Sequence, residues 1–166
     1  MDSKGSVFIS LETIILVLAW IITIAVLFFT VPKNKIREAI LIFFFKQLIT
    51  WVVGLAVAQL KLLEYPVRSF PYATRASFDF EYFIYPAVTV VFNLKYPEGK
   101  SHIRQFLHYF YICTILTVIE VLCVNFTNII LYVHWAWYTT WITTFITLYM
   151  SRKFYFWYFN IHTKNS

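Results

Sequence analysis

The sequence is poor in charged residues and in cysteine, and this shortage limits the class of protein it can encode. Charged residues make up 13% of the 166 residues, whereas 60% are hydrophobic and 22% aromatic. Ordinary soluble domains are about 25% charged and roughly 45–50% apolar. The composition therefore excludes an ordinary soluble domain and indicates an integral membrane protein.

Motifs for disulfides, metal ions and common catalytic sites are also missing. The two cysteines, Cys113 and Cys123, lie in one apolar run. Their spacing along a helix is roughly 15 Å, which is beyond disulfide reach. The sequence has no CxxC, HExxH, Walker or GxSxG pattern. We therefore expect no metal site, no cofactor and no catalytic residue, and a non-enzymatic protein is favoured over an enzyme.

The net charge of +6 does not indicate a nucleic-acid partner. Nearly all of the 14 lysine and arginine residues lie between apolar runs or at their edges. Membrane orientation and contact with anionic lipid explain that placement. The expected partners are the lipid bilayer and either a second copy of the chain or another membrane protein.

Long apolar runs predict an all-α membrane protein that forms one domain over residues 1–166. About 20 apolar residues cross a ~30 Å hydrocarbon core as a helix. The first run is too long for the apolar core of a signal peptide, so we expect it to be retained. The predicted bundle has five spans and an interfacial aromatic tail, at 11–31, 39–60, 78–94, 105–126, 129–150 and 151–166.

The stretch from Glu64 to Pro97 interrupts the apolar runs with prolines and charges. The residues before Pro66 and Pro71 are pushed away from helical angles, which predicts an irregular segment over 64–74. The apolar run that follows, 78–94, is short and contains Pro86. It predicts a kinked third span, with a re-entrant segment as the alternative.

The distribution of basic residues predicts the orientation of the five spans. Segments that would share the C-terminal side of the membrane carry nine Lys and Arg residues, against four on the other side. The positive-inside rule then places the N-terminus outside and the C-terminus in the cytoplasm. The proline-rich part of the central stretch falls on the outer face.

Three ionisable side chains are predicted to meet in the outer third of the bilayer, namely Glu81, Glu120 and His134. Counting about 1.5 Å of rise per residue puts them at similar depths. Buried carboxylates beside an imidazole can carry protons or bind a cation. The alternative is a structural contact, in which Glu120 hydrogen-bonds to His134 or to tyrosine and threonine hydroxyls and only fixes helix packing.

Three further basic residues need separate explanations. Lys46 lies roughly 10 Å below Glu120 along the membrane normal, so we expect its side chain to snorkel toward the cytoplasmic headgroups. Arg68 and Arg75 could hold a phosphate or carboxylate on the outer face. The alternative is that these arginines pair with neighbouring acids and fix the loop to the third span.

The central stretch has the pattern EYPVR…F.FE.F..PA…VFNL.YP. In these residues the chain resembles a family of small membrane proteins of bacilli, clostridia and related spore-forming Gram-positive bacteria. The resemblance implies a protein of the bacterial cytoplasmic membrane with four or five spans and no assigned activity. It also implies that the family motif includes Glu64, Arg68, Glu81, Pro86 and Asn93.

Three functions follow from these patterns, in order of preference. The first is a non-enzymatic structural or accessory membrane protein. The second is a small transporter or ion-conducting protein that uses Glu81, Glu120 and His134. The third is a membrane-embedded enzyme that acts on lipid.

Overall fold

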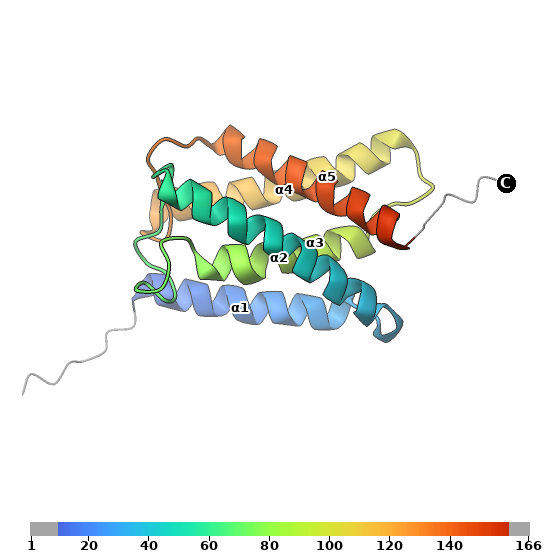
Figure 1. Ribbon diagram of the computed structural model, residues 1–166, viewed down its shortest axis with the longest axis horizontal. Coiled ribbons are helices and arrows are strands. Elements are labelled where there is room, and N and C mark those ends of the chain that lie inside the picture. Colours follow the sequence, from blue (N-terminus) through green and yellow to red (C-terminus); the bar gives the residue numbers. More distant parts are fainter. Residues whose placement is uncertain (1–9, 160–166) are drawn as a thin grey trace, which may run out of the picture.

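The computed structural model describes residues 10–159, which form five helices lying side by side (Figure 1). This confirms the all-α class. A 3-10 turn, Lys33–Lys35, precedes α2, and a π-helical turn, η2, runs directly into α3. The helices are α1 Leu11–Thr30, α2 Ile36–Gln59, η2 Asp79–Ile84 with α3 Tyr85–Leu94, α4 His102–Phe126 and α5 Trp137–Phe159.

Three of these helices are long and apolar enough to cross a membrane by length and composition, namely α1, the Lys33–Gln59 segment with α2, and α4. The structure therefore does not fit the predicted bundle of five spans by this measure. Helix α3 has only 10 residues. Helix α5 has 23 residues, but its threonines, Arg152 and Lys153 make it less apolar.

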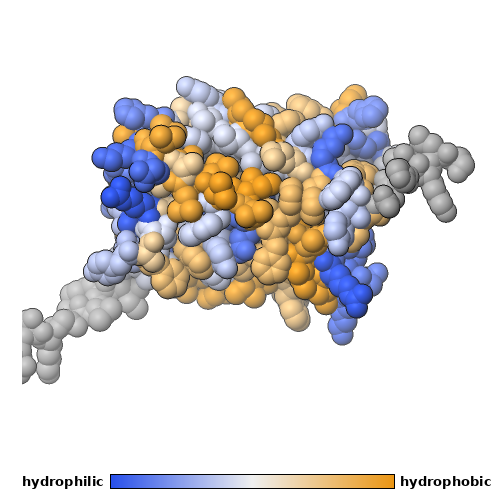
Figure 2. Space-filling view, in the orientation of Figure 1, coloured by the Kyte–Doolittle hydropathy of each residue, from blue (hydrophilic) through white to orange (hydrophobic). Residues whose placement is uncertain are grey.

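The surface carries a broad apolar belt between two polar ends (Figure 2). Helix α1 contributes strongly to this belt, since Leu16 is its one buried residue and Phe28 and Phe29 are 79% and 84% exposed. Apolar surface on this scale marks contact with a membrane or a partner. The belt is therefore consistent with lipid contact.

Helix α2 ends in a turn that brings two distant loops together. Lys61 adopts a left-handed conformation with φ of 52°, and the Leu62 N–H donates to the Val57 carbonyl at 3.1 Å. This pattern closes a helix C-terminus. The following strand β1 (Leu63–Glu64) pairs antiparallel with β2 (Leu131–Tyr132), so the α4–α5 loop lies against the α2 terminus.

Because β2 pairs with β1, the last helix begins later in the chain than the sequence predicts. Helix α5 begins at Trp137 rather than at Ile129, because the residues before it form β2 and a loop. It then continues through Arg152 to Phe159 as a regular helix. The predicted end of the last span at Met150 is therefore wrong, whereas the interfacial position of the tail stays a prediction, and its part at 160–166 lies outside the described residues.

The proline-rich segment is irregular, as the sequence predicts, but its charges do not pair as predicted. Arg68 donates instead to three backbone carbonyls, those of Thr74, Tyr65 and Pro71. Asp79 accepts from the Ser69 N–H and hydroxyl and from the Trp20 indole. Across residues 10–159 the ion pairs are Lys35–Glu38 and Arg152–Glu98. Backbone carbonyls of the tight loop are closer to the Arg68 fork than any acid, so they take its donors.

Candidate functional site

A small polar cavity lies inside the bundle, between α2, the η2–α3 segment, α4 and α5. Its volume of about 70 Å³ leaves room for a few water molecules. Hydroxyl groups make up most of its polar lining, together with two carboxylates and one ammonium group. The polar lining residues are Lys46, Thr50, Tyr65, Glu81, Tyr85, Thr89, Glu120, Thr140, Thr143, Thr144 and Thr147.

Glu120 is 6% exposed and accepts three hydroxyl hydrogen bonds. The Tyr132 and Thr140 hydroxyls donate to its Oε1 at 2.7 and 2.5 Å. The Tyr85 hydroxyl donates to its Oε2 at 2.9 Å. These donors come from β2, α5 and α3, so the carboxylate joins three elements across the end of the cavity.

Glu81 approaches the same cavity from the π-helical turn and is 8% exposed. The Tyr65 hydroxyl lies 3.4 Å from its Oε1. Gly54 of α2 makes room for this side chain, because a Cβ at that position would lie 2.8 Å from Glu81 Cγ and Cδ. A glycine is therefore needed where α2 passes the carboxylate.

Pro86 explains why the turn that carries Glu81 is π-helical and polar. A proline has no N–H to donate to the carbonyl four residues earlier, and its ring crowds that carbonyl. The Tyr85 N–H donates to Phe80, which leaves the carbonyls of Glu81 and Tyr82 without helical partners. Thr50 donates to the Glu81 carbonyl at 2.6 Å, and Gln47 donates to the Tyr82 carbonyl at 2.8 Å.

The prediction that Lys46 snorkels to the cytoplasmic headgroups is wrong. Its side chain is 3% exposed, and its Nζ donates to Thr147 Oγ1 at 2.5 Å inside the bundle. Because α5 begins later than the sequence suggested, its threonine stripe (Thr140, Thr143 and Thr147) provides a polar surface at the depth of Lys46. In the described part of the chain, no carboxylate oxygen lies within 4.0 Å of this ammonium.

The structure brings Glu81 and Glu120 to one cavity but places His134 outside it. His134 is exposed in the loop before α5, and its backbone N–H donates to the Leu62 carbonyl at 3.0 Å. Tyr132, two residues earlier, takes the place at Glu120 that the sequence assigned to His134. Burial raises the pKa of the Tyr132 hydroxyl, so it remains a hydrogen-bond donor at neutral pH.

The structural alternative for Glu120 named tyrosine and threonine hydroxyls as donors, and Tyr85, Tyr132 and Thr140 are such donors. The individual residues could not be chosen from the sequence, because threonine and tyrosine are common in membrane helices. The stripe of Thr140, Thr143 and Thr147 was visible, but it indicates helix contact as readily as a polar cavity. The burial of Lys46 had no sequence signal, since a lysine at that depth can also reach the headgroups.

Arg68 and Arg75 do share a surface cavity of about 420 Å³, together with Lys61 and Glu64. Each terminal nitrogen of Arg68, and its Nε, already donates to a backbone carbonyl. Arg68 is therefore a loop-fixing residue in this structure. Arg75 and Lys61 are the cations of this cavity whose positions are open to an anion.

The residues assigned to the family motif have separate places in the fold. Glu64 is exposed in β1, whereas Arg68 fixes the adjoining loop. Glu81 and Pro86 form the π-helical turn at the cavity. Asn93 is buried one helical turn after Thr89, and its amide nitrogen donates to the Thr89 carbonyl and the Ser151 hydroxyl.

A wide apolar groove of about 460 Å³ lies on the other side of Tyr85 and Glu120, between α1, α3 and α4. Residues of α1 such as Leu18 and Ile22 form one wall. Tyr85, Leu116 and Glu120 line both the small cavity and the groove, so they lie between the two.

Comparison of the chain with protein-family models, curated proteins and solved structures yields no match. The resemblance of the central stretch therefore stays a prediction. What the chain does has to be argued from its own geometry.

Proposed function

We propose that the protein crosses the membrane with all five helices, with its N-terminus outside and its C-terminus in the cytoplasm. The five helices run side by side between two polar ends, which supports this arrangement (Figures 1 and 2). Helix α5 turns polar groups such as Thr140, Ser151 and Arg152 inward, where they are buried. Its low average hydropathy therefore reflects its inner face, and lipid contacts only the outer one.

The end that carries the basic residues supports the orientation. We define the basic end as the one formed by the α1–α2 turn, the α3–α4 loop and the last turns of α5 (Figure 1). It includes Lys33, Lys35, Lys95, Lys100 and Lys153. Positive charge favours the cytoplasmic side.

We further propose that the protein binds a proton or a monovalent cation in its interior cavity and carries it across the membrane. One observation carries this proposal: Glu81, Glu120 and Lys46 line the same cavity, and each is less than a tenth exposed. Ionisable groups at membrane depth are costly unless they are paired or hydrated, and they mark ion and proton pathways.

The charge balance of the cavity indicates the class of ion. With both carboxylates ionised and Lys46 protonated, the cavity holds one net negative charge. An uncompensated charge in a low dielectric is strongly unfavourable. Uptake of one proton or one monovalent cation removes it, and the surrounding hydroxyl oxygens can complete the coordination.

A structural or accessory role is the second candidate, and the saturation of Glu120 favours it. Both of its oxygens already accept hydroxyl hydrogen bonds from three elements. Such a fully satisfied network can serve only to specify how helices pack. The two functions differ in whether the carboxylate ever changes its partners.

Flux measurements on purified protein in liposomes separate the two functions. With an imposed pH or sodium gradient, the wild type should dissipate the gradient, and Glu120→Gln and Glu81→Gln should each reduce the rate at least tenfold. Glu64→Gln is the matched control, since Glu64 is exposed and does not line the cavity. Absent flux in the wild type, or equal flux in all variants, would rule out transport and favour the structural role.

A further inference from the structure

The apolar groove between α1, α3 and α4 has the size of a small-molecule site. Its volume is about 460 Å³. Ligand sites typically measure roughly 300–1,000 Å³ and are mostly apolar, with a few polar groups that fix orientation. The α1 residues that line the groove run from Ile15 to Leu27, roughly 18 Å along the helix. Leu18, Ile22 and Ile119 of its walls are exposed, so the groove opens on the apolar belt and a ligand dissolved in lipid can enter it directly.

Helix α1 is fixed to the bundle by residues that do not line the groove. The Asn128 amide donates to the Glu12 carboxylate at 3.3 Å, beside the start of α1. Further along the helix, the Trp20 ring stacks on Phe83 with the two centroids 4.1 Å apart. These contacts hold the helix in place without filling the hollow next to it. The small side chain of Ala19 lines that hollow.

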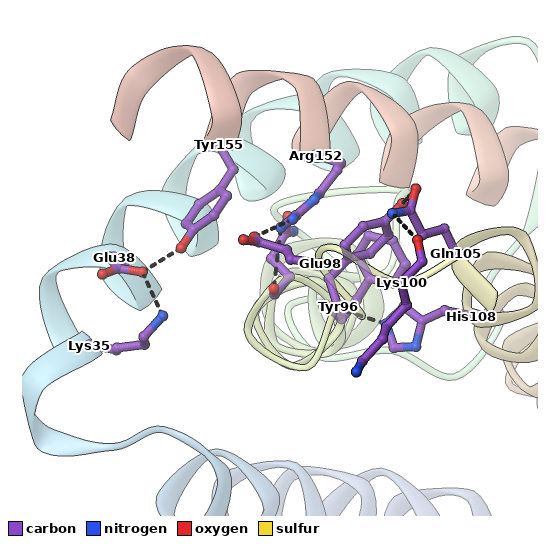
Figure 3. Close-up of polar contacts among 11 residues, drawn as sticks. Lys35, Glu38, Tyr96, Glu98, Lys100, Gln105, His108, Arg152 and Tyr155 are labelled. Carbon is purple, nitrogen blue, oxygen red and sulfur yellow. Dashed lines mark hydrogen bonds and ion pairs between the residues drawn. The ribbon is translucent and has the colours of Figure 1, made fainter. Parts of the chain in front are cut away.

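Glu120 is the one charged side chain among the described residues that line the groove. At the basic end of the bundle, acids are matched by cations, because Glu98 pairs with Arg152 and Glu38 pairs with Lys35 (Figure 3). For Glu120, no basic nitrogen of the described residues lies within 4.0 Å of the carboxylate. The groove therefore presents a carboxylate that lacks a cation of its own.

This carboxylate can accept one more donor. Its Oε1 accepts from both Tyr132 and Thr140, whereas its Oε2 accepts from Tyr85 alone among the described residues. An ionised carboxylate oxygen has two lone pairs, so Oε2 of Glu120 keeps one of them. The rings of Phe80 and Tyr85, with centroids 6.2 Å apart, also line the groove. Aromatic faces attract a cation within about 6 Å, so the rings add to the preference for positive charge.

We propose that the groove binds an amphipathic organic cation with a single positive charge. Its apolar body would lie between α1 and α4, and its charged group would lie at Glu120 and Tyr85. A lipid chain can fill an apolar groove, but it leaves the charge of the carboxylate uncompensated in a low dielectric, which is strongly unfavourable. The groove shares Glu120 with the interior cavity, so the two sites compete for one charge, but binding in the groove requires no passage of ions through the cavity.

Tetraphenylphosphonium and tetraphenylborate are matched probes of this site, because the two ions have the same four-ring shape and opposite charges. Equilibrium binding is measured on the full-length protein in detergent and corrected for uptake by empty micelles. The phosphonium should bind about tenfold or more tightly than the borate. Equal binding of the two ions would mean that the groove takes up any apolar molecule, such as a lipid chain, and would overturn the proposal.

Three variants locate the binding in the groove. Glu120→Gln should weaken tetraphenylphosphonium binding about tenfold or more, because it removes the charge and keeps an acceptor oxygen. Ala19→Phe should block binding, since the added ring fills the hollow. Val17→Phe is the matched control, because Val17 is exposed on α1 and does not line the groove. Undiminished binding in Glu120→Gln or Ala19→Phe, or equal losses in the two phenylalanine variants, would overturn the site.

Comparison of binding with flux separates this site from the proposed transport. Selective tetraphenylphosphonium binding by a protein that shows no proton or sodium flux in liposomes would support the groove site and reject transport. Flux without tetraphenylphosphonium binding would overturn the groove site and leave transport standing.

Discussion

At the scale of single residues, a basic side chain is buried where a neighbouring element supplies it with a hydrogen-bond acceptor. Arg152 and Lys153 are adjacent in sequence, and both follow the predicted span 129–150. The helix continues through them, with Arg152 buried against Glu98 and Tyr96 and Lys153 exposed. Lys46 likewise lies inside the bundle, because Thr147 of α5 accepts its donor.

This contrast predicts different effects of removing the two charges. Arg152→Met should lower the free energy of unfolding by about 1–2 kcal/mol, because the buried Asn93 carbonyl loses its donor, whereas Glu98 is 45% exposed and regains water. Lys153→Met should change it by less than about 0.5 kcal/mol. Denaturant unfolding in detergent, followed by tryptophan fluorescence, measures both. Similar values for the two variants would contradict the buried role of Arg152.

At the scale of elements, the η2–α3 segment depends on α2 for its backbone hydrogen bonds. Pro86 and the π-helical turn leave two carbonyls unpaired, and Gln47 and Thr50 supply donors to them. Within a membrane such replacements are required, since water cannot reach the freed groups. The same π-helical turn places Glu81 opposite Gly54. The turn next to Pro86 therefore produces the kink and also positions the carboxylate.

A double-mutant cycle tests this dependence. Gln47→Leu should cost about 1–3 kcal/mol of stability, because the Tyr82 carbonyl is then buried without a donor. Combined with Pro86→Ala, the cost should shrink, since the restored N–H at position 86 can donate to that carbonyl. Gln59→Leu is the control, because Gln59 is exposed at the end of α2. Strict additivity of the Gln47 and Pro86 variants in thermal unfolding would contradict the coupling.

At the scale of the whole molecule, two polar sites lie toward opposite ends of an apolar belt. The Glu81–Glu120 cavity is nearest the loops that carry β1 and β2, and the cavity lined by Asn93, Glu98 and Lys100 is at the basic end. Both depend on α3 and α5, which length and composition alone do not mark as spans. Whether these two helices cross the membrane therefore decides the architecture.

Cysteine labelling of intact and permeabilised cells measures this directly. After replacement of Cys113 and Cys123, single cysteines at Tyr72 and Val133 should react with an impermeant maleimide in intact cells. Cysteines at Lys95 and Lys153 should react only after permeabilisation. The reverse order would invert the orientation, and labelling of both ends of α3 or of α5 from one side would show that this helix does not cross.

Much of the fold could be predicted because runs of about 20 apolar residues favour helices, which satisfy their own backbone hydrogen bonds. The predicted runs 11–31, 39–60 and 105–126 agree within a few residues with α1, α2 and α4. The prediction for the last run failed because β-pairing is a contact between distant segments, and it moved the start of α5 to Trp137. Glu81 and Glu120 were identified by their cost at membrane depth, which requires no knowledge of their partners.

The sequence by itself determined the helical class, the apolar belt and the irregular proline-rich segment, since each follows from composition or from local backbone restrictions. Only the tertiary structure decided which polar groups meet. It directed Lys46 inward, replaced His134 with Tyr132 at Glu120 and left Asn93 Oδ1 without a partner. The physical reason is that hydrogen bonds act over about 3 Å, whereas a helix can rotate or shift by several ångströms without changing its apolar pattern.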